Sequence, residues 1–378
     1  MKKKVMSLLL AAAMTATLFA GCGSDNGTAD KTTGDNAAPS TEAAGDETGT
    51  DGYELALVID VGTIDDKSFN QGSWEGVKKY GDENGVAYKY YKSAEATTDS
   101  FQETIALAIE GGAKVIVCPG FLFEEPIYNM QTQYPDVKFI LIDGEPHDAE
   151  SNYATAENTM AVLYEEDQAG FLAGYAAVKD GYTKLGFMGG MALPAVIRYG
   201  YGYLAGADYA AKELGVDVDV TYTYTGSFEA TPEAQSMATG WYQAGTEVIF
   251  ACGGSVGNSV MAAAEASDNA KVIGVDVDQS SESDTVITSA MKMLSNSVYD
   301  AIKAAYDGSF PGGKTTVFDA ANDGVGIAMD TAKFNTFSQA DYDEVFAKLV
   351  AGEITIDNDV EKEVSDLELS NVTVNYVQ

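Results

Sequence analysis

An internal repeat constrains this chain more than any other feature of its sequence. After residue 52, four apolar runs are each long enough for a buried strand, and four more follow in the same order. Corresponding positions keep a nearly constant offset: Val86 and Val216 lie 130 residues apart, and Asp143 and Asp276 lie 133 apart. Because a repeat at fixed spacing reflects a repeated structural unit, the sequence predicts two similar lobes.

Helical segments separate the apolar runs. Between the second and third runs, for example, Phe101, Ile105 and Ala108 recur at helical spacing. Strands that alternate with helices predict parallel sheets with helices on both faces. The expected fold class is therefore α/β, with two doubly wound, Rossmann-like lobes. We expect strands at 55–60, 86–93, 114–118, 137–143, 184–190, 218–226, 247–252 and 271–276, and helices at 68–84, 100–110, 126–133, 194–214, from 231, and at 258–266.

Carboxylates lie at the ends of three predicted strands. Ligands of open parallel sheets bind beyond the carboxyl ends of the strands, so two facing lobes would hold a ligand in the cleft between them. Asp60, Asp143 and Asp276 occupy such ends. A carboxylate accepts hydrogen bonds from vicinal hydroxyls or ring N–H groups. The alternative is that each aspartate caps the helix that follows it.

Two phenylalanines also stand near predicted strand ends. Phe69, followed by Asn70, and Phe228 each precede a helix and lie outside its apolar stripe. Two opposed rings suit a flat heterocycle, because base–aromatic stacking contributes about 1–3 kcal/mol per base. The alternative is that each ring fills a gap in its own lobe. Lys292 is a candidate cation for binding hydroxyl groups, although a lone lysine is also typical of a solvated surface.

The N-terminus predicts a lipid anchor. Lys2, Lys3 and Lys4 precede an apolar run at 5–20, which is too short for a transmembrane helix. Small residues then precede Cys22, as in the lipobox of bacterial lipoproteins. We expect residues 1–21 to be a signal peptide and Cys22 to carry the lipid. Residues 23–52 lack Val, Ile, Leu, Met and aromatic side chains, so 22–52 is expected to be a disordered tether.

Charge and motif content disfavour several functions. The net charge of -36 argues against nucleic-acid binding. The only histidine, His147, lies in a predicted surface turn, and no Cys/His spacing fits zinc. We therefore expect no enzymatic activity, no cofactor and no metal. Cys118 and Cys252 end apolar runs and are expected to be buried free thiols. The run 252–257 nearly matches a dinucleotide-binding glycine motif, but that motif is weak evidence alone.

The body of the chain resembles the basic membrane protein family of bacterial lipoproteins, which are type I substrate-binding proteins of ABC importers. The similarity rests on five segments: DVGTIDDKSFNQGSWEG at 60–76, YPDVKFILIDG at 134–144, EEDQAGFLAGYAA at 165–177, GFMGGM at 186–191 and GVDVDQ at 274–279. The first is long and specific. The resemblance implies a type I periplasmic-binding-protein fold with the ligand in the interlobe cleft.

Nucleoside-binding members of this family imply roles for particular residues. The base would contact Phe69, Asn70 and Phe228, and the ribose would bind Asp276 and Lys292. Asp60 matches the strand-end aspartate of the first motif, and the remaining ligand-binding positions are Asp143 and Gly253. The chain departs from the family at 250–254, where a His-Ala-Ala-Gly-Gly stretch is common and Phe-Ala-Cys-Gly-Gly stands here.

The resemblance also implies partners and boundaries. We expect a monomer, anchored at the outer face of the cell membrane, that delivers purine nucleosides to an ABC permease and ATPase. Lobe one is expected at 53–158 with about 293–312 returning to it, and lobe two at 159–292 with about 313–378. Alternatives are a flavin- or sugar-binding lipoprotein of the same fold, or a sensory or surface lipoprotein.

Overall fold

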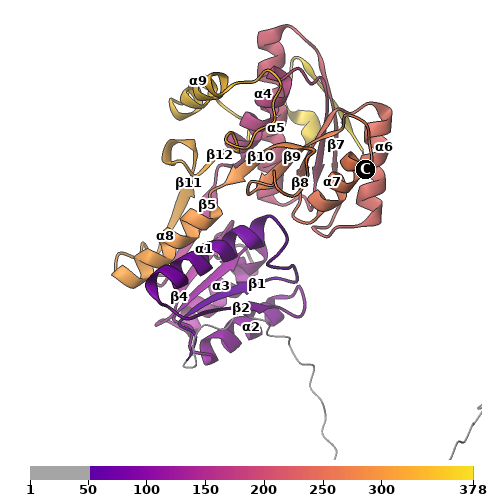
Figure 1. The fold of residues 1–378 in the computed structure, drawn as a ribbon. Helices are drawn as coiled ribbons and strands as arrows, with labels where there is room; N and C mark the ends of the chain where they lie inside the picture. The colour runs from indigo at the N-terminus through magenta and orange to yellow at the C-terminus, as the bar shows by residue number, and fades with distance from the viewer. Residues whose placement is uncertain (1–51, 378) are drawn as a thin grey trace, which may run out of the picture. The chain divides into compact units, whose positions relative to one another are not determined.

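Residues 52–377 are described by the computed structural model, and helices and strands alternate through them as the repeat predicts (Figure 1). The predicted signal peptide, Cys22 and the tether up to residue 51 lie outside these residues. The first part of the chain contains β1 (Leu55–Ile59), α1 (Phe69–Asn84), β2 (Tyr88–Lys92), α2 (Thr98–Glu110), β3 (Val115–Pro119), a short 3₁₀ helix (Phe121–Phe123), α3 (Glu124–Gln133), β4 (Lys138–Ile142) and β5 (Thr159–Tyr164).

The second part repeats this order and then extends it. It contains α4 (Glu166–Lys179), β6 (Lys184–Gly189), α5 (Pro194–Leu214), β7 (Val218–Tyr224), α6 (Pro232–Ala244), β8 (Val248–Cys252), α7 (Val256–Glu265), β9 (Lys271–Asp276) and β10 (Val286–Lys292). After it come α8 (Leu294–Asp307), β11 (Lys314–Phe318), β12 (Val325–Ile327), α9 (Gln339–Val350) and β13 (Val372–Tyr376).

The strands form two sheets, each at the centre of one lobe. The first sheet has the order β11-β5-β4-β3-β1-β2 and is parallel throughout. The second has the order β12-β10-β9-β8-β6-β7-β13, and β12 is antiparallel. Apart from the added edge strands, both sheets follow the doubly wound order 2-1-3-4-5, and this order places ligands at the carboxyl ends of the strands. The predicted fold class is confirmed.

The chain passes between the two sheets three times, and two strands lie in a different sheet from the one predicted. It leaves the first sheet after β5, returns after β10 and leaves again after β11. The predicted boundaries assign 159–164 and 314–318 to lobe two, whereas β5 and β11 pair with each other in the first sheet, from Lys314 opposite Met160 to Phe318 opposite Tyr164. An offset between repeats locates the repeated strands but does not show where the chain changes lobe.

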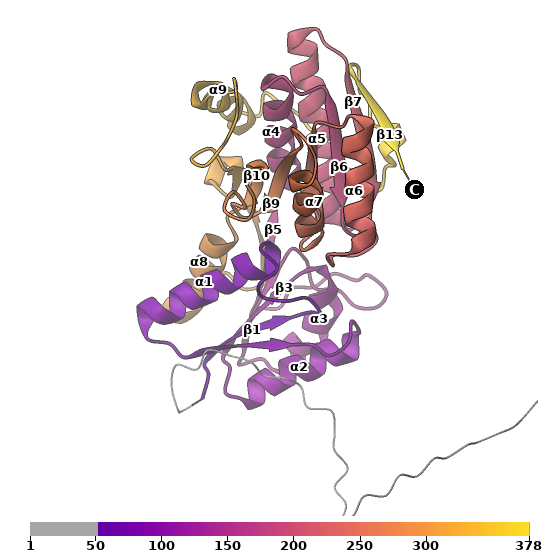
Figure 2. The ribbon, with the colours of Figure 1, turned by 45° about the vertical axis from the view of Figure 1, so that its right-hand side comes forward.

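Successive side chains along each strand point to opposite faces of the sheet and pack into a hydrophobic core on each face. On β1, Leu57 belongs to the core under α1 and α8, and Val58 belongs to the core under α2 and α3. Figure 2 shows α1 and α8 side by side on one face of the first sheet and α2 on the other. In the second lobe, Phe187 packs towards α4 and α5, and Met188 towards α6 and α7.

Both predicted buried thiols are confirmed, since Cys118 and Cys252 are free and buried in β3 and β8. Within residues 52–377, no helix combines the length and apolar character that crossing a membrane requires.

Candidate functional site at the strand ends

Two aspartates end equivalent strands and share an uncommon backbone conformation. Asp143 follows β4 and Asp276 ends β9, and their φ angles are 58° and 66°. Few residues other than glycine adopt a positive φ. The repeat therefore reproduces the turn that presents each carboxylate as well as the strand before it.

Lys292 lies at the centre of a buried charge cluster. It ends β10 and is 3% exposed, so it is not a solvated surface lysine. Its Nζ pairs with the Asp143 carboxylate and, at 2.9 Å, with Glu166 Oε1. Three aromatic rings lie within cation–π range of Nζ, those of Phe69 at 5.2 Å, Tyr164 at 5.2 Å and Tyr199 at 5.5 Å. The fold thus brings together three of the predicted residues: Phe69, Asp143 and Lys292.

Glu166 completes the cluster, although sequence reasoning did not identify it. It lies in the first turn of α4 and is 0% exposed. Its Oε2 accepts a hydrogen bond from Arg198 Nε at 2.5 Å. A glutamate in the first turn of a helix is normally a surface residue that favours the helix dipole. One feature of the sequence could have indicated that a carboxylate is buried here: Arg198 is the single arginine in a strongly acidic chain.

Burial and neighbouring charges set the protonation of this cluster. Burial raises the pKa of Asp143 to about 7, although Lys292 opposes the shift. Burial also raises the pKa of Asp276. For Glu166, burial acts in the same direction, but Lys292 and Arg198 outweigh it and hold the pKa below its usual value. The positive charge of Lys292 therefore stabilises the ionised form of several carboxylates at once. Of these, Asp143 gains a proton more readily than Glu166.

Asp66 holds the loop that carries Phe69 and Asn70. Its carboxylate accepts hydrogen bonds from the backbone N–H groups of Ser68, Asn70 and Gln71 at 2.9, 3.0 and 3.0 Å. Asp66 is itself buried, and this burial raises its pKa to about 6. Sequence reasoning did not identify Asp66, because consecutive acidic residues in a loop usually face solvent. Its three bonds fix the start of α1 and with it the position of Phe69.

Asp60 and Asn70 face a common point in the same loop. Asp60 Oδ1 accepts a hydrogen bond from Gly62 N at 2.8 Å. A Cβ atom on Gly62 would lie 2.9 Å from Asp60 Oδ1 and 2.8 Å from Asn70 Nδ2. Asp60 therefore stabilises its own turn, and this turn brings its carboxylate beside the Asn70 amide.

Phe228 and Gly253 form a second group, in lobe two. A Cβ atom on Gly190 would lie 2.4 Å from Phe228 Cδ1, and one on Gly253 would lie 2.7 Å from Gly190 N. The half-buried Phe228 ring thus packs over Gly190, which follows β6, and Gly190 in turn lies against Gly253, which follows β8. Within the described residues, the rings of Phe69 and Phe228 make no contact with each other.

Contacts between the lobes involve the same loops. Ser68 Oγ donates a 2.5 Å hydrogen bond to Asp276 Oδ2. The buried Gln279 donates from Nε2 to the backbone oxygen of Lys67 at 2.7 Å. The loop before α1 is therefore bonded directly to the loops that follow β9, and Asp276 takes part in holding the lobes together.

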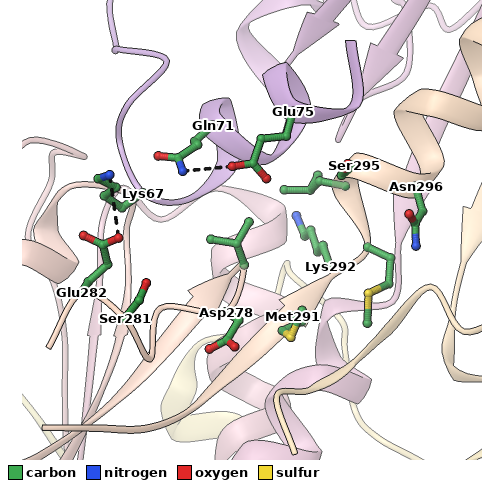
Figure 3. A pocket seen from close by; sticks show the side chains of 13 residues that line it. Lys67, Gln71, Glu75, Asp278, Ser281, Glu282, Met291, Lys292, Ser295 and Asn296 are labelled. Atoms are coloured by element: carbon green, nitrogen blue, oxygen red, sulfur yellow. Dashed lines mark hydrogen bonds and ion pairs between the residues drawn. The ribbon is translucent and has the colours of Figure 1, made fainter. Parts of the chain in front are cut away.

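A pocket of about 360 Å³ lies beside these contacts (Figure 3). Lys67, Gln71 and Glu75 line it from the first lobe, and residues of the loops around β9 and β10 line it from the second. Figure 3 shows the ion pair between Lys67 and Glu282, which are 3.8 Å apart. Of the eight residues predicted for the ligand site, Lys292 alone lines this pocket, so the pocket is not the site that the sequence predicts.

No group of acidic, histidine and cysteine side chains suited to a metal ion occurs in the part of the chain that the structure describes. His147 lies in a loop, as predicted, and is half-buried. Its Nε2 is 3.1 Å from Glu124 Oε2, and its ring lies 5.0 Å from that of Tyr153.

Comparison with known proteins identifies one family. Residues 53–359 match the model of the Bmp family, described as ABC transporter substrate-binding protein PnrA-like. The ABC transporter nucleoside-binding protein BmpA of Lactococcus lactis subsp. cremoris is 29% identical, over 88% of this chain and 93% of its own. The CD4+ T-cell-stimulating antigen of Listeria innocua is 27% identical, over 94% of this chain and 99% of its own.

Solved structures support the fold. A solute-binding protein of an ABC transporter system from Aeropyrum pernix has a TM-score of 0.70, with 24% sequence identity, and the match covers 80% of this chain and 92% of that one. At this identity the likeness concerns the two-lobed architecture alone.

Proposed function

The chain belongs to the Bmp family of PnrA-like ABC transporter substrate-binding proteins, and on that premise we propose that it captures a purine nucleoside for import. The observation that carries the proposal is the position of Lys292, which pairs with Asp143 while its Nζ lies 5.2 Å from the Phe69 ring. A hydroxyl-binding cation, a carboxylate and an aromatic ring thus meet at one group of strand ends.

Each residue in this arrangement has a role that a nucleoside would use. The carboxylates of Asp276 and Asp143 accept hydrogen bonds from ribose hydroxyls, and the Lys292 ammonium donates to a ribose oxygen. Phe69 stacks on one face of the base, and Asn70 bonds to the base edge with its amide. The similarity to the L. lactis protein, whose name describes nucleoside binding, supports this ligand class.

Phe228 and Gly253 complete the site from lobe two when the lobes close. The ring of Phe228 covers the second face of the base, and Gly253, which lies against the Gly190 backbone, contributes its own backbone to the site. The Ser68–Asp276 hydrogen bond already joins a residue beside Phe69 to a ribose-binding carboxylate. The function is therefore capture by closure, with Asp60 holding the loop of the first lobe.

The mature protein is anchored to the outer face of the cell membrane through the lipid on Cys22. From there it acts as a monomer, and its closed form docks on the permease that the ATPase drives. The two-lobed fold and the family support this arrangement. The lipid itself can be tested by the mass of the purified N-terminal peptide, and an unmodified Cys22 would contradict the anchor.

The ligand class is tested by thermal unfolding of the purified protein, after partial unfolding and refolding to remove bound ligand. Nucleosides, free bases, ribose, riboflavin and common sugars are added at about 1 mM. A ligand present at about 1,000 times its Kd stabilises by about 4 kcal/mol, which raises Tm by several degrees. We expect a shift with purine nucleosides but not with ribose or bases. A shift with riboflavin or a sugar alone would replace the proposed ligand.

The stacking residues are tested by titration calorimetry of Phe69→Ala and Phe228→Ala. Each loses one stacking face, so we expect the Kd for the nucleoside to rise about 10- to 100-fold. Phe310→Ala is the matched control, because Phe310 contacts Lys138 at the start of β4, at the opposite end of the strand from Asp143. Unchanged affinity in both site variants would contradict the sandwich.

A further inference from the structure

We infer that Glu166 is a positioning residue, which holds Lys292 in the orientation that binds the ligand and connects it to the segments where the chain crosses between lobes. This inference rests on the proposed function, because it assigns to Lys292 a contact with the ribose. Glu166 is 0% exposed, so it acts through Lys292 and not by touching the ligand.

The carboxylate of Glu166 is shared between two cations. One oxygen lies 2.9 Å from Lys292 Nζ, and the other accepts from Arg198 Nε at 2.5 Å. The close packing of α4 against α5 allows this geometry, because Glu166 begins α4 and Arg198 lies at the start of the second turn of α5. Arg198 therefore fixes the glutamate, and the glutamate in turn fixes the lysine.

The donors of Lys292 show what this arrangement leaves for a ligand. An ammonium has three N–H donors. Asp143 accepts one of them, and Glu166 Oε1 lies 2.9 Å from Nζ as an ion-pair partner without a hydrogen bond. No further hydrogen bond of Lys292 occurs within residues 52–377. Asp143 Oδ1 is likewise buried without a hydrogen-bond partner there. Donor capacity on the Lys292 ammonium and an acceptor on Asp143 thus remain beside each other, as a hydroxyl group that both donates and accepts requires.

Without Glu166, the ammonium would turn towards its remaining anionic neighbours. Those neighbours are Asp143 and Asp276, both of which stabilise the charge of Lys292. An ammonium paired fully with these carboxylates would compete with the ribose for the same oxygens. Glu166 therefore keeps the ligand-binding carboxylates available.

The turn that carries Glu166 also contacts other segments that cross between the lobes. Glu165 N donates to Phe318 O at 2.9 Å, and Gln168 Oε1 accepts from Ala320 N at 2.8 Å. Tyr164, just before the turn, is hydrogen-bonded through its hydroxyl to Ser297. Residues from all three segments that connect the two sheets thus meet around Glu166. A movement of one lobe relative to the other is therefore transmitted to Lys292 through Glu166.

The test compares two ligands in Glu166→Gln by titration calorimetry: a purine ribonucleoside and its 2′,3′-dideoxy analogue. Glutamine keeps the size but turns one acceptor into a donor that faces a cation. We expect the Kd for the ribonucleoside to rise at least about tenfold and that for the dideoxy analogue by less than about threefold, because the analogue lacks the hydroxyls that Lys292 binds. Glu165→Gln, with the same charge change one residue earlier, should leave both Kd values unchanged.

An equal loss for both ligands would overturn the positioning role while leaving nucleoside binding intact. If the unaltered protein binds no nucleoside, the proposed function fails, and this inference fails with it. Should Glu166→Gln not fold, Glu166→Asp replaces it. Its side chain is one methylene shorter and cannot span both cations, so the same selective loss is expected.

Discussion

A buried lysine such as Lys292 is stable only because its neighbours supply opposite charge. Burial by itself would lower the pKa of Lys292, but Asp143 and Glu166 outweigh it and raise that pKa above its usual value. Removing one partner of a buried ion pair costs about 3–5 kcal/mol, since an uncompensated charge remains. At the residue scale, the cluster thus combines a stabilising role with the binding role proposed above, and substitutions in it must be interpreted with a measurement of stability.

Asp143 should make the stability of the protein depend on pH. Its folded-state pKa of about 7 lies above the ordinary value of 3.8, so the folded protein keeps a proton that the unfolded chain has lost. Its contribution to the free energy of unfolding is fully present below about pH 3.8 and is lost as the pH rises to about 7. The full effect is at most about 4 kcal/mol.

Urea unfolding of the unaltered protein and of Asp143→Asn, at a series of pH values, measures this contribution. Asparagine does not titrate, so the stability of the unaltered protein relative to the variant should fall between about pH 4 and pH 7 and then stay constant. A difference that is constant over this window would show that Asp143 keeps an ordinary pKa in the folded protein.

At the scale of elements, four glycines allow α4 and α5 to pack backbone against backbone. A Cβ atom on Gly170 would lie 2.2 Å from Tyr199 O, and one on Gly174 would lie 2.1 Å from Tyr203 O. On α5, Gly202 and Gly206 meet backbone oxygens of α4 at 2.0 Å in the same way. Since backbone atoms cannot rotate away as a side chain can, any larger residue must separate the helices.

We expect Gly170→Ala to lower the free energy of unfolding by about 2–4 kcal/mol, because overpacking here moves a whole helix. The matched control is Gly240→Ala in α6, where a Cβ atom would meet nothing within 4 Å. There alanine should be neutral or stabilise by up to about 1 kcal/mol. Chemical denaturation of both variants gives the comparison, and equal effects would contradict the close approach of the helices.

How far the sequence predicts these elements depends on the signal that each one carries. The repeated strands were predictable because buried parallel strands are apolar runs, and this prediction placed Asp143 and Asp276 at strand ends. The strand that ends at Lys292 was not predicted, and the structure places Lys292 against Asp143. The lobe of β5 and β11 was not predictable, because pairing between Thr159–Tyr164 and Lys314–Phe318 joins segments far apart in the chain. Glu166 was missed for a similar reason, since its burial follows from tertiary packing.

At the scale of the whole molecule, one apolar core extends through both lobes. It includes Leu57 and Val162 of the first lobe and Phe171 and Phe250 of the second. It also includes Leu294, which begins α8 where the chain returns from the second sheet to the first. Lobes that share a core and three connections should not unfold independently. We therefore expect a single thermal transition in the ligand-free protein. Scanning calorimetry tests this through the ratio of calorimetric to van't Hoff enthalpy, and a ratio near two, with separate transitions, would contradict it.

The interleaving of the two sheets along the chain has a consequence for how the protein is made. The first sheet is complete only when β11 (Lys314–Phe318) has been added at its edge. The second is complete only when β13 (Val372–Tyr376) has been added at its own edge. A polypeptide that emerges from the ribosome from its N-terminus therefore has an open sheet edge at β5 until most of it has been translated. That delay exposes the nascent chain to aggregation through its open edge, and it keeps both sheets incomplete until the last strands have been made.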